Sequence, residues 1–233
     1  MAGELVKNVV DIPELRDEVG IFRDRAHAGK VLAGMLGSFK NSEAIVLGVP
    51  AGGVPVAAAI AKELNLVFDV AVVSKITLPW NTEAGYGAVA FDGSIRLNEK
   101  LLPRLGLSEQ QVEEGIQKTR QKVTSRVRRL RGQREFPDLR ERPVILVDDG
   151  LASGYTLMAG VEALRKAKAI QIIIAVPTGH WGSVEMIADQ VHTVYCSNIR
   201  RGWSFAVADA YLRWSDLTDE DVERILNQVR REE

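Results

Sequence analysis

The run from Val144 to Thr156 constrains the fold of this chain more than any other segment. It opens with four consecutive apolar residues, a pattern typical of a strand buried on both faces of a sheet. Two adjacent carboxylates, Asp148 and Asp149, end this strand. A short turn with two glycines follows, and from Leu157 onward apolar residues recur at helical spacing. The run therefore predicts a buried strand, a tight turn and a helix in direct succession.

The turn between this strand and helix has the composition of an anion-binding site. Glycine lets the backbone turn its N–H groups toward a ligand, and the N-terminus of a helix adds partial positive charge. The two carboxylates cannot bind the same anion, so they need a hydroxyl donor or a metal beside it. The pattern therefore indicates a sugar phosphate. An isolated Asp-Asp-Gly turn has a plainer interpretation, in which one acid caps the helix and the other is solvated.

The same run resembles the signature of the type I phosphoribosyltransferases, which use phosphoribosyl diphosphate (PRPP). That signature is four apolar residues, two acids, two variable positions, Ala or Thr, Thr or Ser, Gly, any residue and Thr, and every position is met here. The resemblance implies that Asp148 and Asp149 bind the ribose hydroxyls and that the turn up to Thr156 holds the 5′-phosphate. The implied PRPP-binding residues are Asp148, Asp149, Gly150, Leu151, Ala152, Ser153, Gly154, Tyr155 and Thr156.

A second glycine-rich turn follows the apolar run from Ala44 to Val49, and the segment from Leu47 to Val56 is similar to the family's pyrophosphate loop. In the family, main-chain N–H groups of this loop, often joined by a basic side chain, meet the departing diphosphate. The resemblance assigns this role to Pro50, Ala51, Gly52, Gly53 and Lys75. Ala51 departs from the family pattern, which has arginine or lysine, and Lys75 could supply the replacement charge. Taken alone, the two glycines fit a tight turn that lets a helix pack closely on its strand.

The segment from Trp203 to Tyr211 is similar to the family's hood, which covers the nucleobase. A flat ring there could stack on a base, and the candidates are Trp203, Phe205 and Trp181, with hydrophobic core as the alternative role for Phe205. In the family members that use 6-oxopurines, an aspartate occupies the position of Ala152. This chain therefore departs from the hypoxanthine and guanine pattern. The segment Phe22-Arg23-Asp24-Arg25-x-His27-Ala28-Gly29 resembles the opening of a subgroup of the family, so the similarity extends over nearly the whole chain.

Strand patterns alternate with helix patterns, which predicts an α/β fold with a mostly parallel sheet and helices on both faces. The expected strands are residues 44–49, 68–73, 144–147, 170–176 and 191–195. Ligands of such sheets lie beyond the carboxyl ends of the strands, so the two glycine-rich turns should open into one cleft. We expect one domain over residues 1–233, with an insertion at about residues 78–140, a hood at about residues 198–215 and a closing helix at residues 218–226.

The insertion has four features of its own. Asp92-Gly93 predicts a hairpin, and Ser108 with Gln111 forms a capping box that starts a helix. The segment from Leu78 to Ala90 matches the family's mobile catalytic loop. From Lys118 to Arg134 there are basic residues and no acidic one, which is either a solvated helix balanced by acids elsewhere or a surface that binds RNA phosphates.

The chain of 233 residues has a formal net charge of −1, which gives no general bias toward nucleic acids or acidic membranes. Its one cysteine, Cys196, excludes an internal disulfide and fits a buried strand. No apolar stretch approaches the roughly 18 residues of a membrane span, and the first residues lack a signal-peptide core, so we expect a cytoplasmic protein.

The resemblance implies transfer of the phosphoribosyl group of PRPP to a nitrogenous base, with release of pyrophosphate. Mg²⁺ would be the cofactor, held mainly through PRPP with help from Asp148 or Asp149, and no dedicated metal cage is expected. The implied catalytic residues are Asp148, Asp149 and Lys75, the partners are PRPP and a base, and a homodimer is expected. The alternative is a regulatory protein that senses PRPP or a nucleotide with little turnover. A P-loop kinase or a dinucleotide oxidoreductase fits poorly, because neither of their glycine motifs follows a strand.

Overall fold

A computed structural model of the chain describes residues 8–202 and 204–232, apart from the side chains of residues 82, 83 and 232. Its centre is a six-stranded sheet in which every neighbouring pair of strands is parallel. In spatial order the strands are β1 (Val9–Val10), β9 (Thr193–Arg200), β8 (Gln171–His180), β7 (Pro143–Val147), β2 (Ile45–Gly48) and β3 (Val67–Val70). The predicted α/β fold with a mostly parallel sheet is confirmed.

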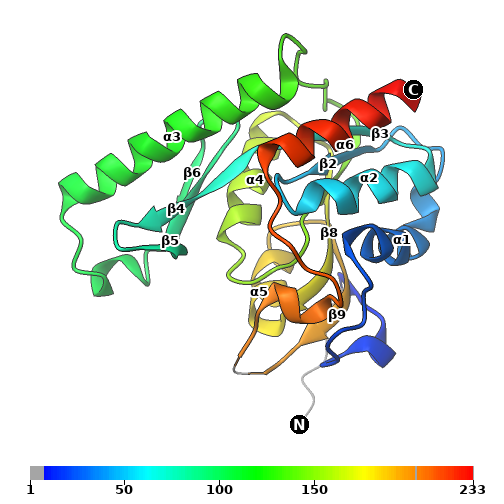
Figure 1. The fold of residues 1–233 in the computed structure, drawn as a ribbon, viewed down its shortest axis with the longest axis horizontal. Coiled ribbons are helices and arrows are strands. Elements are labelled where there is room, and N and C mark those ends of the chain that lie inside the picture. The colour runs from blue at the N-terminus through cyan, green and yellow to red at the C-terminus, as the bar shows by residue number, and fades with distance from the viewer. Residues whose placement is uncertain (1–7, 203, 233) are drawn as a thin grey trace.

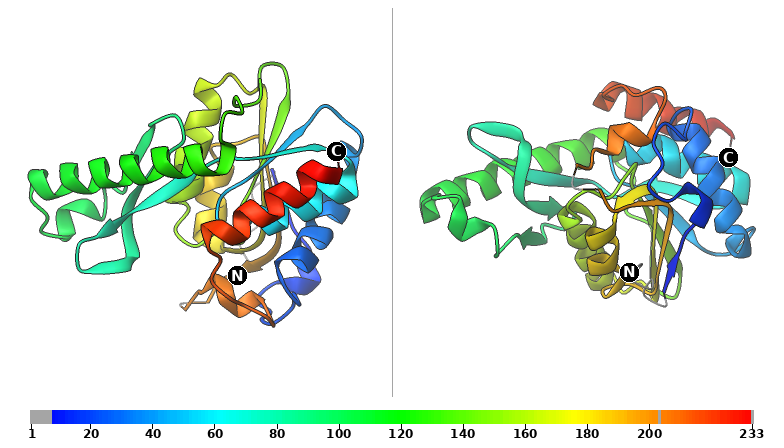
Figure 2. Two further views of the ribbon diagram at one scale, coloured as in Figure 1. Left: turned by 45° about the horizontal axis from the view of Figure 1, so that its top comes forward. Right: turned by 90° about the horizontal axis from the view of Figure 1, so that it is seen from below.

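Helices cover both faces of this sheet, as predicted (Figures 1 and 2). On one face, α1 (Arg25–Met35) and α2 (Gly53–Leu64) bury Val46, Ile145 and Ile173. On the other, α4 (Tyr155–Lys166) and α5 (Trp181–Ala188) bury the alternate strand residues, including Leu146. Because both faces are covered, β2 and β7 carry apolar residues or glycine at every position rather than alternating apolar with polar residues.

The insertion forms an arm that projects to one side of the molecule (Figure 1). It contains the antiparallel strands β4 (Val73–Leu78), β5 (Asn81–Ala90) and β6 (Ile95–Leu97) and the long helix α3 (Glu109–Arg131). The predicted hairpin and capping box are both present: β5 and β6 pair across Asp92-Gly93, and Ser108 and Gln111 cap each other's main-chain N–H groups.

Two sequence-based boundaries in this region were wrong. The strand predicted at residues 68–73 is two strands in different sheets, because β3 ends at Val70 and β4 begins at Val73. Residues 70–73 are all apolar, so the sequence does not indicate where the chain leaves the first sheet. The segment from Leu78 to Ala90, predicted as a loop, is mostly the strand β5, which pairs with β4 through glycines that allow close contact.

The chain ends in α6 (Asp219–Glu232), which contacts α2 and the arm helix α3 (Figures 1 and 2). Short 3-10 helices occur at Pro13–Leu15, Gly37–Phe39, Leu102–Arg104 and Val207–Ala210. Cys196 is fully buried in β9, as predicted, and burial raises the pKa of its thiol. Among the described helices, none is both long enough and apolar enough to cross a membrane.

Candidate functional site

The two glycine-rich turns meet at one edge of the parallel sheet. β2 and β7 are neighbours with Gly48 opposite Val147, so both turns begin at the same level. The Val49 N–H donates to the Val147 carbonyl at 2.8 Å, and a Cβ on Gly53 would lie only 2.4 Å from that carbonyl oxygen. Only glycine permits this approach. The prediction that both turns open on the same side of the sheet is confirmed.

Asp149 is the residue at which the two turns touch. A Cβ on Gly52 would lie 1.8 Å from Asp149 Oδ2, so the carboxylate packs directly against the main chain of the other turn. The same oxygen accepts a hydrogen bond from Arg25 Nε at 2.8 Å, in an ion pair whose side chains are 10% and 16% exposed. The Tyr211 hydroxyl donates to the Asp149 carbonyl at 2.6 Å. Asp149 therefore joins the turn after β2, the helix α1 and the hood.

Asp148 is the less engaged of the two acids. Its Oδ1 accepts a hydrogen bond from the Asp149 main-chain N–H at 2.9 Å, and the residue is half-buried. Burial, together with the neighbouring charge of Asp149, raises the pKa of Asp148 well above its ordinary value. Burial also raises the pKa of Asp149, although Arg25 acts in the opposite direction. A ligand whose hydroxyl groups donate to these oxygens would stabilise their charged forms.

The turn after β7 ends in main-chain N–H groups that donate to no acceptor among the described residues. Leu151 exchanges two main-chain hydrogen bonds with β8, each 2.9 Å long, which fixes the start of the turn. Gly154 has a φ of +82°, a conformation that favours glycine. The Met158 N–H donates to the Gly154 carbonyl, but no described residue accepts a hydrogen bond from the N–H groups of residues 152–156. This is the arrangement that binds phosphate at a helix start.

The turn after β2 also presents main-chain N–H groups. Those of Ala51 and Gly52 donate to no other residue in the described part of the chain. The peptide bond between Pro50 and Ala51 is cis. Ala51, where the family pattern has a cation, packs against an apolar cluster that includes Val123 of α3 and Val222 of α6. The side chain at this position is therefore partly buried against apolar residues.

Lys75, the other residue assigned to the leaving group, lies in β4 of the arm. The stem of its side chain covers Gly85 of β5, where a Cβ would lie 2.2 Å from Lys75 Cγ. The sequence placed Lys75 just beyond a strand of the main sheet, but that strand ends at Val70. Lys75 thus belongs to the second sheet, and its role in catalysis stays a prediction.

Both described aromatic candidates for base binding already have a guanidinium against them. The Arg200 Cζ lies 5.0 Å from the centre of the Phe205 ring, and His180 meets the same ring edge-on at 5.9 Å. The Arg201 Cζ lies 4.0 Å from the centre of the Trp181 ring. A base could therefore stack only on faces that these cations leave open. Trp203, the third candidate, lies outside the described residues.

Three residues that contribute to the site were not predicted as site residues from the sequence: Arg25, Tyr211 and Trp214. The Arg25 guanidinium binds Asp149, donates to the Ser215 carbonyl at 2.9 Å and stacks on the Trp214 ring at 3.9 Å. The same arginine lines an open pocket of about 620 Å³ with Trp214 and Leu217. The family resemblance of the segment that contains Arg25 was the available signal, but nothing in it names Asp149 as the partner.

The basic stretch of α3 is partly neutralised within the protein. Three of its arginines form ion pairs with acids of α6 or β3: Arg126 with Asp219, Arg129 with Glu220 and Glu223, and Arg131 with Asp69. These pairs match the first of the two interpretations of the stretch, a helix balanced by acids elsewhere. Binding of RNA stays a prediction, with fewer charges left to support it.

Comparison with known proteins identifies the family. The model of the phosphoribosyl transferase domain family matches residues 91–210, which is just over half of the chain. Two proteins of Mycobacterium tuberculosis, from strains CDC 1551 / Oshkosh and H37Rv, are each provisionally named a phosphoribosyl transferase. Both are 32% identical to this chain over 212 residues. The match covers 91% of this chain and 48% of each relative, so the chain spans about half the length of these curated relatives.

A solved structure is similar to this chain over nearly its whole length. The crystal structure of TT1426 from Thermus thermophilus superposes with a TM-score of 0.72 at 33% identity, and the match covers 89% of this chain and 98% of that chain. The fold, the meeting of the two turns and these similarities agree. This chain belongs to the phosphoribosyl transferase domain family.

Proposed function

We propose that this protein is an Mg²⁺-dependent phosphoribosyltransferase that transfers the 5-phosphoribosyl group of PRPP to a nitrogenous base and releases pyrophosphate. The observation that carries the proposal is the contact between Asp149 and Gly52, which joins a turn suited to a sugar phosphate to a turn suited to a second anion. PRPP carries a phosphate at one end of its ribose and a diphosphate at the other. The two sets of unused N–H groups, on either side of an acid pair, suit those two ends.

In this proposal each part of the site has one task. The N–H groups of residues 152–156 bind the 5′-phosphate, and those of Ala51 and Gly52 bind the diphosphate. Asp148 and Asp149 accept hydrogen bonds from the ribose hydroxyls. During transfer the bond from the anomeric carbon to the diphosphate oxygen breaks and a bond to the acceptor nitrogen forms. Positive charge that develops on the sugar is then stabilised by the nearby carboxylates.

The residues present fit a magnesium ion that arrives with its substrate. No group of three or more ligating side chains that could hold a metal occurs among the described residues. Mg²⁺ prefers phosphate, carboxylate and water oxygens, and the Asp149 carboxylate lies against Gly52 in the turn proposed for the diphosphate. When bound, the ion would neutralise the charge of the leaving diphosphate.

One residue of the signature turn, Ala152, limits which base can be the acceptor. The family's 6-oxopurine members have an aspartate where this chain has Ala152, and here the Ala152 carbonyl accepts a hydrogen bond from the Ser183 hydroxyl. We therefore propose an acceptor other than hypoxanthine or guanine.

A pyrophosphate-release assay tests the activity. The protein is incubated with PRPP, Mg²⁺ and, in separate reactions, purines, pyrimidines and other nitrogen acceptors. Release of pyrophosphate that depends on one acceptor is the expected result. Calorimetric titration with PRPP and Mg²⁺ accompanies the assay. Binding of PRPP without turnover across the panel would favour the sensing alternative, whereas absence of PRPP binding would contradict both.

A further inference from the structure

The turn after β2 carries no cationic side chain of its own, since its residues are Pro50, Ala51, Gly52 and Gly53. A diphosphate has more negative charge than a pair of N–H groups can balance. Ala51 itself is partly buried and packs against an apolar cluster to which both α3 and α6 contribute. A group outside the turn must therefore contribute to diphosphate binding.

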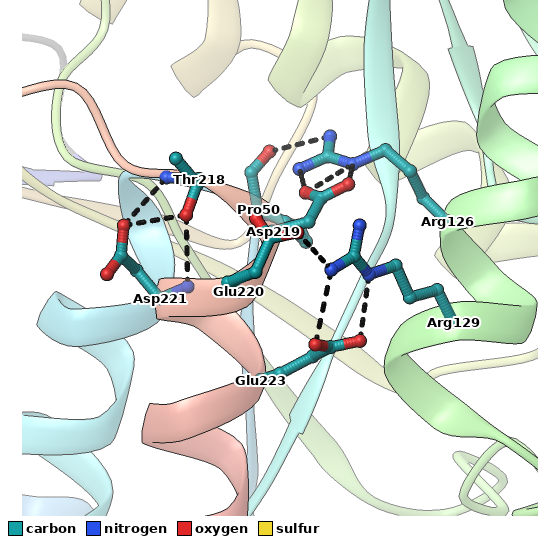
Figure 3. Close-up of polar contacts among 8 residues, drawn as sticks. All are labelled: Pro50, Arg126, Arg129, Thr218, Asp219, Glu220, Asp221 and Glu223. Atoms are coloured by element: carbon teal, nitrogen blue, oxygen red, sulfur yellow. Dashed lines mark hydrogen bonds and ion pairs between the residues drawn. The ribbon is translucent and has the colours of Figure 1, made fainter.

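One guanidinium reaches the turn from the arm. Arg126 of α3 donates from Nη1 to the Pro50 carbonyl at 3.4 Å (Figure 3). Asp219, the first residue of α6, holds the other edge of the same guanidinium through Nε at 3.0 Å and Nη2 at 2.6 Å. The two side chains are 13% and 24% exposed. Three segments far apart in the chain thus converge at the Pro50 carbonyl.

We infer that Arg126 is a positioning residue for diphosphate binding and that Asp219 orients it. The Pro50 carbonyl and the Ala51 N–H belong to one rigid peptide plane, so a bond that holds the carbonyl also fixes the direction of the N–H. Asp219 accepts hydrogen bonds from two nitrogens of Arg126, and this pair of bonds holds the planar guanidinium in one orientation. The arm and the C-terminal helix are therefore parts of the leaving-group site, although neither contains its N–H groups.

Arg126 could act on the turn through its charge or through the geometry of its hydrogen bonds. Its ion pair with Asp219 favours geometry. Its charge is balanced by the Asp219 carboxylate within hydrogen-bond distance, so the pair as a whole presents little net charge to an anion bound at the turn. An effect through geometry therefore outweighs an effect through charge. If charge were decisive, Asp219 would oppose anion binding, and its removal would strengthen that binding.

Arg129 provides a matched control on the same helix. It lies about one turn beyond Arg126 and binds Glu220 and Glu223 of α6 at 2.6 and 2.8 Å (Figure 3). Its side chain is 40% exposed, and its hydrogen bonds in the structure run to α6 rather than to the turn. Loss of Arg129 therefore weakens the contact between α3 and α6 without removing the bond to Pro50.

The inference rests on the proposed function. The test therefore uses two ligands, so that failure of the inference can be told apart from failure of the proposed function. Binding of Mg²⁺-pyrophosphate and of ribose 5-phosphate is measured by calorimetry for the unaltered protein and for Arg126→Gln, Arg126→Lys, Asp219→Asn and Arg129→Gln. We expect Arg126→Gln to bind pyrophosphate about 10-fold more weakly, as for the loss of a charged hydrogen bond. Its affinity for ribose 5-phosphate should stay within about 2-fold, because that ligand occupies the other turn.

The remaining variants sharpen the result. Arg126→Lys should recover part of the pyrophosphate affinity, since an ammonium can reach one partner but not hold both. Asp219→Asn should weaken pyrophosphate binding, and Arg129→Gln should leave both affinities unchanged. Equal losses in Arg126→Gln and Arg129→Gln, or tighter binding by Asp219→Asn, would overturn the inference alone. If the unaltered protein binds neither pyrophosphate nor ribose 5-phosphate, the proposed function fails and takes the inference with it.

Discussion

The guanidinium of Arg25 lies between the carboxylate of Asp149, at 2.8 Å, and the ring of Trp214, at 3.9 Å. The arginine is the first residue of α1, and the acid follows the signature strand β7, 124 positions later. This contact fixes the position of the Asp149 carboxylate at the point where the two turns meet. It also acts on the pKa of that acid, because Arg25 counteracts the increase that burial causes.

Arg25→Met should therefore weaken both the fold and ligand binding. Removal of one partner from a largely buried ion pair costs about 3 kcal/mol, since the other charge is left without compensation. The pKa of Asp149 should rise further, so that more of it is protonated at mildly acidic pH. We expect the affinity for PRPP to fall more at about pH 5.5 than at about pH 8. Urea unfolding and calorimetry at the two pH values measure these effects.

Arg23→Met is the control for this experiment. Arg23 is two residues away and pairs at 3.0 Å with Asp24, and its side chain is 60% exposed. An exposed pair of this kind contributes little to stability. A loss in Arg23→Met as large as that in Arg25→Met would contradict a specific role for the contact with Asp149.

Gly52→Ala should disrupt the contact between the two turns. A Cβ at this position would lie 1.8 Å from Asp149 Oδ2, so either the turn or the acid must move. We expect at least a 10-fold loss of PRPP affinity, which corresponds to about 1.4 kcal/mol. Gly34→Ala in α1 is the matched substitution, because no atom lies within 4 Å of its added Cβ. That variant should bind PRPP normally and unfold at slightly higher denaturant concentration, since alanine favours the helix by up to about 1 kcal/mol.

Asp148→Asn should separate stability from binding. The folded protein holds a proton on Asp148 more tightly than the unfolded chain, because burial and Asp149 raise its pKa. The stability of the unaltered protein therefore falls as the pH rises from the ordinary value of 3.8 through the raised pKa, and it stays lower above that pKa. Asparagine carries no charge, so the variant should be more stable at neutral pH, on the order of 1 kcal/mol or about 2–4 °C in Tm.

Thermal unfolding across the pH range tests this expectation. The gain should shrink as the pH falls through the raised pKa and disappear below the ordinary one. PRPP binding should be weaker in the same variant, because the amide presents one acceptor oxygen where the carboxylate has two. If the variant is less stable than the unaltered protein at pH 7, the charge of Asp148 does not destabilise the folded state, and the prediction is wrong.

How much of this site could be predicted from the sequence depends on how local each part is. The turn from Asp148 to Thr156 is contiguous, so one strand, one turn and one helix start place every group in it. Arg25 and Arg126 are different, because their partners lie 124 and 93 residues away and only the assembled sheet brings them together. The break between β3 and β4 was missed for a related reason. All residues from Val70 to Val73 are apolar and buried, both where β3 ends in the first sheet and where β4 begins in the second. The sequence therefore gives no signal of the point where the chain passes from one sheet to the other.

The hood packs on the signature turn at Gly150, and a compensating pair of substitutions can test that contact. A Cβ on Gly150 would lie 2.4 Å from Val207 Cγ1, and the contact is with a side chain rather than with backbone. Gly150→Ala should therefore push the hood segment Val207–Ala210 away from the turn. Because Tyr211, the next residue, binds the Asp149 carbonyl, the displacement should also weaken PRPP binding. Val207→Ala removes the clashing methyl groups, so the double variant should regain most of the affinity and stability that Gly150→Ala loses. Affinity and Tm measured for the two single variants and the double variant form a closed cycle. Additive losses in the double variant would mean that the hood and the turn are not coupled through this contact.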